Sequence, residues 1–160
     1  MSTGTLIGIA RRAKSRALME ELSEAEISTE AGLSGDSKGV KVPRRQITLL
    51  ERELWEAALF TLGNPDLHWT ARRANLLVEG LSLPRGVGSE ISVGPVRLEV
   101  TAQTTPCARM DEIWQGLRRA LAPDWRGGIT ARVISGGPVA LGDPVKILRE
   151  IAPHKVHLPG

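Results

Sequence analysis

The single cysteine of the chain, Cys107, is the residue whose type and surroundings best suit chemistry. It stands in residues 104–111, where Pro106 stiffens the chain directly before it. A predicted helix N-terminus and Arg109 both place positive charge nearby, which favours the thiolate. A thiolate can act as a nucleophile or as a metal ligand, and the residue type and its loop leave both roles open. The alternative is an inert packing residue, because free cysteine is among the most buried residue types.

A second stretch with chemical potential is R-R-A-N-L at residues 72–76. If a strand begins at Asn75, then Arg73 and Asn75 point to the same face. An arginine fork beside an amide suits a phosphate or a polar heterocycle. A solvent-exposed polar face explains the same pattern equally well. The turn-type run G-L-S-G-D at residues 32–36 is weaker still, since a simple connection accounts for it.

Other catalytic constellations are missing from the sequence. It contains no nucleophile elbow, P-loop or dinucleotide fingerprint. His154 and His157 have an H-x-x-H spacing in a proline-flanked tail, and no Cys/His set can build a tetrahedral zinc centre. Nothing around His68 indicates a positioned base, which disfavours a cysteine protease.

Composition narrows the class of protein. The 160 residues are 41% hydrophobic and 24% charged, as in an ordinary soluble domain. The net charge of +3 is spread over short basic pairs, without the aromatic-rich basic stripe of a nucleic-acid binder. No apolar run approaches the roughly 20 residues of a membrane span. The single cysteine and the absence of a secretory signal predict a cytoplasmic protein that binds neither nucleic acid nor a membrane.

The elements that must position these residues are predicted to be mainly strands. With 17 glycines and 10 prolines, the chain is divided into short segments. Residues 96–103 alternate with period two, and we expect Val96, Leu98, Val100 and Ala102 to face the core. The other predicted strands are residues 5–9, residues 90–93 as a hairpin partner of 96–103, and residues 129–134 paired with 145–148.

Two segments predict helices. Thr48 followed by Glu51 forms a capping box for the first helix, and Gly63 stops it. Asp111 caps the second helix, and Pro123 ends it. The apolar stripes are Leu50, Leu54, Ala57 and Ala58 in the first helix, and Ile113, Trp114, Leu117 and Leu121 in the second. Trp55, Met110 and Trp114 are expected to pack in the core or between helices.

Taken together, these stretches resemble the MOSC domain, the family named for the C-terminal domain of molybdenum-cofactor sulfurase. The resemblance runs from about residue 5 to residue 148, with the landmarks in the family's order. They are an opening strand followed by K-S at 14–15, G-L-S-G-D at 32–36, R-R-Q-I-T-L-L at 44–50, R-R-A-N-L at 72–76, P-C at 106–107 and R-V-I-S-G-G-P-V-A-L-G-D at 132–143. The length indicates a stand-alone member, a single domain over residues 1–160 with a tail at 149–160.

The resemblance implies a mainly β, barrel-like fold with a few peripheral helices. It also implies that Cys107 ligates molybdenum in a pterin-based (molybdopterin-type) cofactor. Better-studied relatives reduce N-hydroxylated compounds at such a metal, which would make this chain a molybdenum-dependent oxidoreductase of N-hydroxylated bases or related N-oxygenated compounds. The sequence carries no flavin or iron–sulfur signature, so we expect an external electron-transfer protein or reductase as partner and a small molecule as substrate.

The same resemblance assigns cofactor contacts to other residues. Lys14 and Ser15 match a Lys-Ser pair that holds the phosphate of the pterin. Arg73 and Asn75 match an R-x-N pattern that contacts the cofactor, and Thr105 is expected to donate a hydrogen bond nearby.

The chain departs from the family pattern at Ser37, where relatives often have arginine directly after the aspartate of the G-L-x-G-D motif. Lys38 is expected to supply that charge from the next position, as a point donor without the bidentate fork.

Two other functions stay open from the sequence. One is a sulfur carrier, in which Cys107 holds a persulfide and transfers its sulfur. The other is a non-enzymatic module that binds an anionic ligand while Cys107 is only structural.

Overall fold

The structure is a computed structural model that describes residues 2–14, 16–37 and 43–153. Ser15 and Lys38, two of the residues predicted to contact a cofactor, lie outside the described residues, as do His154 and His157.

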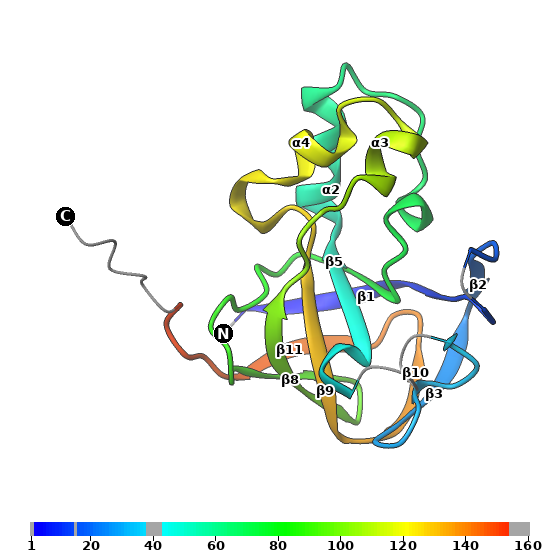
Figure 1. The fold of residues 1–160 in the computed structure, drawn as a ribbon. Coiled ribbons are helices and arrows are strands. Elements are labelled where there is room, and N and C mark those ends of the chain that lie inside the picture. Colours follow the sequence, from blue (N-terminus) through cyan, green and yellow to red (C-terminus); the bar gives the residue numbers. More distant parts are fainter. Residues whose placement is uncertain (1, 15, 38–42, 154–160) are drawn as a thin grey trace.

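A closed β-barrel forms the body of the molecule (Figure 1). Seven strands build it within the described residues: β1 (Thr3–Arg11), β5 (Ile47–Glu51), β6 (Leu76–Glu79), β7 (Glu90–Val93), β8 (Val96–Gln103), β9 (Ile129–Ser135) and β11 (Pro144–Arg149). Their order is β11-β7-β8-β9-β5-β6-β1, and pairing of β1 with β11 closes the ring. Only the pairing of β5 with β6 is parallel among these neighbours. The mainly β, barrel-type fold predicted from the sequence is confirmed.

A smaller sheet flanks the barrel. It consists of β10 (Gly137–Ala140), β3 (Glu24–Ser28) and β4 (Gly32–Leu33), while β2 (Glu20–Leu22) extends the barrel sheet beside β1. Because β10 lies between β9 and β11 in the chain and pairs with β3, the connection does not return as a hairpin. The predicted pairing of residues 129–134 with 145–148 is therefore wrong, although both strands exist. β9 pairs with β5 and β8, and β11 pairs with β1 and β7.

The barrel interior is filled by the alternating apolar side chains of its strands. Val96, Leu98 and Val100 of β8 are fully buried, as their spacing predicts. Ala102 is exposed instead, because the register of β8 against β9 shifts between Val100 and Ala102. Such a bulge reverses the faces of the residues that follow it. The strand predicted over residues 96–103 is correct in its bounds but not in the face of its last alanine.

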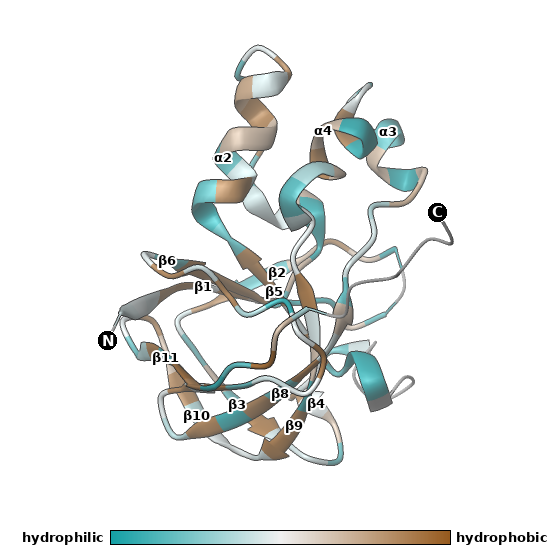
Figure 2. Cartoon of the chain, turned by 90° about the vertical axis from the view of Figure 1, so that its left-hand side faces the viewer, coloured by the Kyte–Doolittle hydropathy of each residue, from teal (hydrophilic) through white to brown (hydrophobic). Residues whose placement is uncertain are grey.

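Three short α-helices of the described chain cover one end of the barrel (Figures 1 and 2). They are α2 (Arg52–Thr61), α3 (Arg109–Ile113) and α4 (Leu117–Leu121). A second apolar cluster, which includes Trp55, Trp69 and Leu121, packs between these helices and the outside of the barrel. None of the described helices has the length and apolar character needed to cross a membrane.

The first predicted helix begins later than its capping signal indicates. Thr48 lies buried in β5, and the helix starts at Arg52 with Glu51 as its N-cap residue. The run Ile47–Glu51 is buried at every position because both faces of β5 are covered: Ile47 and Leu49 belong to the barrel core, and Leu50 belongs to the cluster under the helices. The capping box of Thr48 is therefore wrong, and a fully paired strand position explains why.

The second predicted helix is broken into α3 and α4. Gly116, with φ of 90°, separates them in a left-handed conformation that suits glycine. Asp111 Oδ1 accepts hydrogen bonds from the backbone N–H groups of Gly116 (3.2 Å) and Arg118 (3.1 Å), so this carboxylate caps α4 and not α3. Trp55 and Met110 are buried as expected, but the break leaves Trp114 44% exposed.

Candidate functional site

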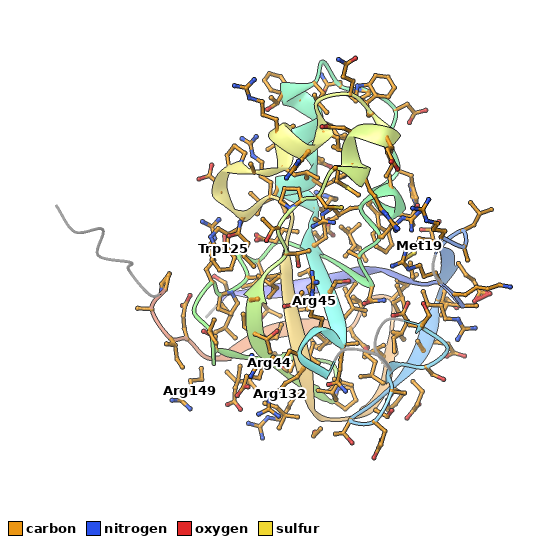
Figure 3. The ribbon with its side chains drawn as sticks, viewed as in Figure 1. Met19, Arg44, Arg45, Trp125, Arg132 and Arg149 are labelled. Carbon is orange, nitrogen blue, oxygen red and sulfur yellow. The ribbon has the colours of Figure 1, made fainter. Side chains whose placement is uncertain are left out.

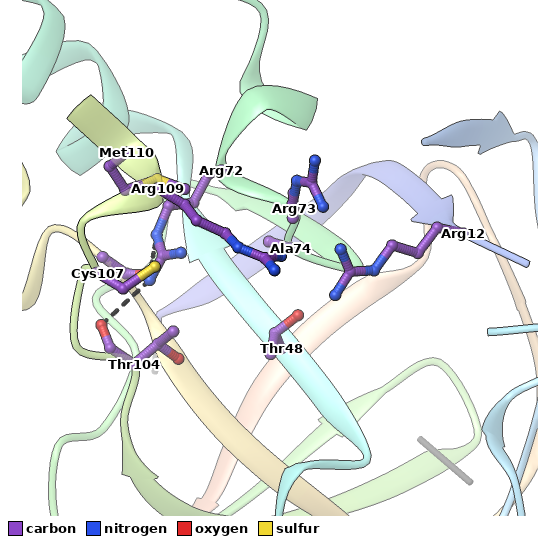
Figure 4. Close-up of a pocket in the computed structure, with 10 residues that line it drawn as sticks. Arg12, Thr48, Arg72, Arg73, Ala74, Thr104, Cys107, Arg109 and Met110 are labelled. Atoms are coloured by element: carbon purple, nitrogen blue, oxygen red, sulfur yellow. Dashed lines mark hydrogen bonds between the residues drawn. The ribbon is translucent and has the colours of Figure 1, made fainter. Parts of the chain in front are cut away.

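A cavity of about 220 Å³ opens between the barrel and its helical cap (Figure 4). Its walls come from segments far apart in the sequence: the end of β1, β5, the turn before β6, the loop between β8 and α3, and the turn before β9. The lining side chains that can carry chemistry are Cys107, Arg12, Arg72, Arg73, Arg109, Thr48 and Thr104. We call this the arginine cavity. No carboxylate of the described residues lines it.

Cys107 lines the arginine cavity and is exposed. The loop that carries it follows β8 and leads into α3, as predicted, and Pro106 beside it is buried. Because α3 has only five residues, its dipole adds little to the local field. The positive charge around the thiol therefore comes from the arginine side chains.

Arg72 is the most deeply buried of these arginines, with 8% of its surface exposed. Its Nε donates to the carbonyl of Gly127 (3.1 Å) and its Nη2 to the carbonyl of Thr104 (3.3 Å). Burial lowers the pKa of Arg72 to about 10, an effect that the negative charge of a Cys107 thiolate opposes and the charge of Arg45 reinforces. Arg72 thus ties the Cys107 loop to the turn before β9 and places a cation beside the sulfur. Arg45 ends the 3-10 turn η1 (Pro43–Arg45) shortly before β5, and its side chain is exposed (Figure 3).

Arg12 and Arg73 each carry one guanidinium nitrogen that has no hydrogen-bond partner among the described residues. Nη1 of each is buried without a hydrogen-bond partner, and so is Oγ1 of Thr104. Burial lowers the pKa of Arg12, and the charges of Arg73 and Arg109 lower it further, whereas Asp36 opposes them. Asp36 also accepts a hydrogen bond from the backbone N–H of Arg12 (3.1 Å). The arginine cavity is therefore lined by mutually repelling cations, and two of them have a buried nitrogen without a hydrogen-bond partner among the described residues.

Asn75 lies outside the cavity lining and is 4% exposed. Its Oδ1 accepts from the N–H and the hydroxyl of Thr48 (3.0 Å each), and its Nδ2 donates to the carbonyl of Ala10 (3.2 Å). Arg73, by contrast, has φ of 64° and ends a 3-10 turn, η2 (Trp69–Arg72). The predicted shared strand face is wrong, because β6 begins at Leu76 and the left-handed residue turns Arg73 into the cavity.

The other predicted contacts are scattered. Lys14 is exposed and does not line the arginine cavity. Thr105 is exposed and lines a different hollow with Pro106, Arg118 and Arg119. Of the predicted residues that the structure describes, Cys107 and Arg73 meet in the cavity.

Five polar residues of the cavity were not predicted as cofactor contacts: Arg12, Arg72, Arg109, Thr48 and Thr104. In the sequence, only the basic pairs at 11–12 and 72–73 draw attention to Arg12 and Arg72 as possible ligand contacts. In the first pair, Arg11 turns outward and forms an ion pair with Glu20 (2.8 Å), which leaves Arg12 for the cavity. Spacing alone does not indicate which member of a pair faces inward.

A second hollow of about 400 Å³ adjoins the arginine cavity, and Arg73 lines both. Its walls combine the apolar Met19 and Ile113 with the basic Arg16. His68, also in this wall, is 2.9 Å from Glu21 through its Nε2 and belongs to an exposed pair.

The comparisons with known proteins agree with this architecture. The family profile described as MOSC domain matches residues 36–146. The YuaD protein of Bacillus subtilis superposes with a TM-score of 0.76 at 17% identity, covering 91% of this chain and 97% of its own. YiiM of Escherichia coli superposes with a TM-score of 0.70 at 19% identity, covering 98% and 79%. YiiM of Geobacillus stearothermophilus gives 0.65 at 16% identity, covering 91% and 73%. No curated protein sequence matches the chain closely enough to count as a relative.

Proposed function

This chain belongs to the MOSC domain family, which is associated with binding of the molybdenum cofactor, and we propose that it holds this cofactor in the arginine cavity. The observation that carries the proposal is an exposed thiol that opens into a cavity whose described lining has four arginines and no carboxylate. The cofactor is anionic and rich in hydrogen-bond acceptors. The cavity offers the complementary groups.

The residues present fit such a group. Within the part of the chain that the structure describes, Arg12, Arg73 and Thr104 each leave a buried donor atom unpaired, which is costly unless a ligand satisfies it. The sulfur of Cys107 can serve as a metal ligand once it is deprotonated. The adjoining hollow offers further space for a ligand that extends past Arg73.

Cys107 would hold the metal, and the four cavity arginines would neutralise the negative charge around it. Arg72 would keep the Cys107 loop in place through its two carbonyl contacts. Lys14, with Ser15, is proposed to bind the phosphate; Lys14 is two residues before Arg16, which lines the adjoining hollow. Lys38 and Asn75 remain proposed contacts on the family pattern alone. Thr104 faces the cavity where Thr105 does not, and takes the hydrogen-bonding role expected of Thr105.

We propose reduction of N-hydroxylated bases or related N-oxygenated compounds as the reaction. When bound, molybdenum supplies the two-electron chemistry that removes the oxygen atom. The protein would bind and orient the small-molecule substrate. An external electron-transfer protein would deliver the electrons.

The test is metal and pterin analysis of the native chain, produced in a host that makes the cofactor. We expect molybdenum and pterin to copurify with the chain and both to be lost in Cys107→Ala. Arg118→Met, outside the arginine cavity, is the matched control that should retain both. Native protein without molybdenum from that host would overturn the proposal. Turnover of an N-hydroxylated base with a chemical reductant then tests the reaction class.

Sulfur transfer is the second candidate, because an exposed thiol among cations would also stabilise a persulfide anion. Cyanide treatment of freshly isolated protein would then release thiocyanate, and Cys107→Ala would release none. Protein that yields no thiocyanate but contains molybdenum supports the first candidate.

A further inference from the structure

The unpaired donors of the arginine cavity form a pattern that metal ligation by Cys107 does not explain. Four buried side-chain polar atoms lack a partner in the chain as the structure describes it, and three of them belong to cavity residues. These three are Nη1 of Arg12, Nη1 of Arg73 and Oγ1 of Thr104. The two guanidinium nitrogens only donate hydrogen bonds, and the hydroxyl can donate. Such a set fits a ligand that only accepts.

Among the three residues, Thr104 gives the strongest evidence that a ligand binds here. Only 5% of the surface of Thr104 is exposed. Native proteins rarely leave a hydroxyl buried to this degree without a hydrogen-bond partner. The neighbouring Thr105 is exposed and lines another hollow. Of these two neighbouring threonines, only Thr104 therefore contributes a buried hydroxyl to the wall of the arginine cavity.

The charge and the size of the cavity further restrict the class of ligand that fits it. Arg12, Arg73 and Arg109 are close enough that the last two lower the pKa of the first, and no carboxylate of residues 2–14, 16–37 and 43–153 lines the cavity. A volume of about 220 Å³ holds a tetrahedral oxyanion together with several waters, each of which takes about 30 Å³ in the liquid. An oxyanion presents acceptors in several directions and reduces the repulsion among the arginines.

We propose that Arg12, Arg73 and Thr104 form a binding site for a tetrahedral oxyanion, which binds there without help from the Cys107 thiol. The oxyanion can be free phosphate or sulfate, or an anionic group of a larger ligand. The proposal does not depend on molybdenum binding, because the site is defined by donor groups of the chain itself.

The experiment is calorimetric titration of inorganic phosphate into the full chain, produced in a host that cannot make the molybdenum cofactor. Binding should weaken about ten- to a hundredfold in Thr104→Val and in Arg73→Met, the loss expected for one hydrogen bond to a charged group. Thr105→Val is the matched control, and Cys107→Ala separates the oxyanion site from the thiol. Both should bind phosphate like the unaltered chain.

Two further measurements keep the result interpretable. Thr104→Ser retains the hydroxyl and should bind like the unaltered chain, so a folding defect of Thr104→Val can be told from a lost contact. The same titration into cofactor-loaded chain distinguishes the sources of the oxyanion. Lost binding there means that the cofactor's anionic group takes the site, and retained binding means that the site serves a free oxyanion beside the cofactor.

The proposal is overturned if the cofactor-free chain does not bind phosphate. It is also overturned if Thr104→Val and Arg73→Met both bind normally, or if Cys107→Ala weakens binding as strongly as they do. Failure of the molybdenum proposal is seen separately, as absence of metal from chain made in the competent host.

Discussion

Neighbouring residues of the same type take opposite roles around the arginine cavity. Arg11 pairs with Glu20 on the outside, while Arg12 faces the cavity. Thr104 is buried against the cavity, while Thr105 is exposed. Because each member of such a pair has the same chemistry, a matched variant of its neighbour is the natural control for every substitution in the site.

Substitutions of Asn75 and of Arg73 should have clearly different effects on the free energy of unfolding. Asn75→Ala removes the hydrogen bonds that link β1, β5 and β6, and leaves the N–H of Thr48 and the carbonyl of Ala10 without them. We expect a loss of about 3 kcal/mol in the free energy of unfolding. Arg73→Met breaks no hydrogen bond within the described chain and should change stability by less than about 0.5 kcal/mol. Urea unfolding of both variants checks this, and an unchanged stability of Asn75→Ala would contradict it.

The boundary between β5 and α2 is the place where the helix start predicted from the sequence differs from the structure. Glu51 ends the strand and is the N-cap residue of the helix, yet it is 9% exposed. Burial raises the pKa of Glu51 to about 7, although the N–H of Leu83 and the charge of Arg85 act against that shift. The carboxyl group therefore keeps its proton in the folded chain at a pH where the unfolded chain has lost it.

This buried carboxyl predicts a pH dependence with a definite sign. Between pH 4.5 and about 7 the folded state binds the proton that the unfolded state has released, so stability falls as the pH rises through that range. The loss is complete above about pH 7 and amounts to at most about 3 kcal/mol. Glu51→Gln should remove it. Urea unfolding at pH 5 and pH 8 measures the difference, with the exposed Glu112→Gln as control.

At the scale of the whole molecule, the arrangement of charge follows the arrangement of the barrel. Arg132 forms an ion pair with Glu99 across β8 and β9 (2.6 Å), at the end of the barrel away from the helices (Figure 3). No arginine of the cavity, which lies under the helical cap, forms an ion pair among the described residues, although the charge of Asp36 acts on Arg12. The cavity therefore holds an excess of positive charge.

Closure of the barrel between β1 and β11 should be visible in hydrogen exchange. A closed ring has no frayed edge, so amides of β1 and β11 that pair across the closure should exchange only with global unfolding, like those of β8 and β9. The short strands β2 and β4 should exchange faster. Exchange followed by NMR tests this. Rapid exchange along β1 and β11 would show that the ring opens in solution.

Local patterns predicted much of this protein correctly. The alternation over residues 96–103 predicted β8 with its bounds, and Pro106 with Cys107 after it predicted a loop that presents the thiol. The ordered motifs predicted the family, which the profile match over residues 36–146 confirms. These succeed because period-two burial and turn chemistry act between residues close in sequence.

Tertiary structure alone decided which side chains form the site. Thr48 looks like a helix cap until β6 and β9 pair with β5 and bury it. Arg12, Arg72 and Thr104 become neighbours only when β1, η2 and the loop after β8 meet under the helical cap. Burial, hydrogen-bond partners and the pKa of a group depend on segments far away in the chain. The sequence therefore determined the thiol and its loop, and the fold selected the arginines that surround it.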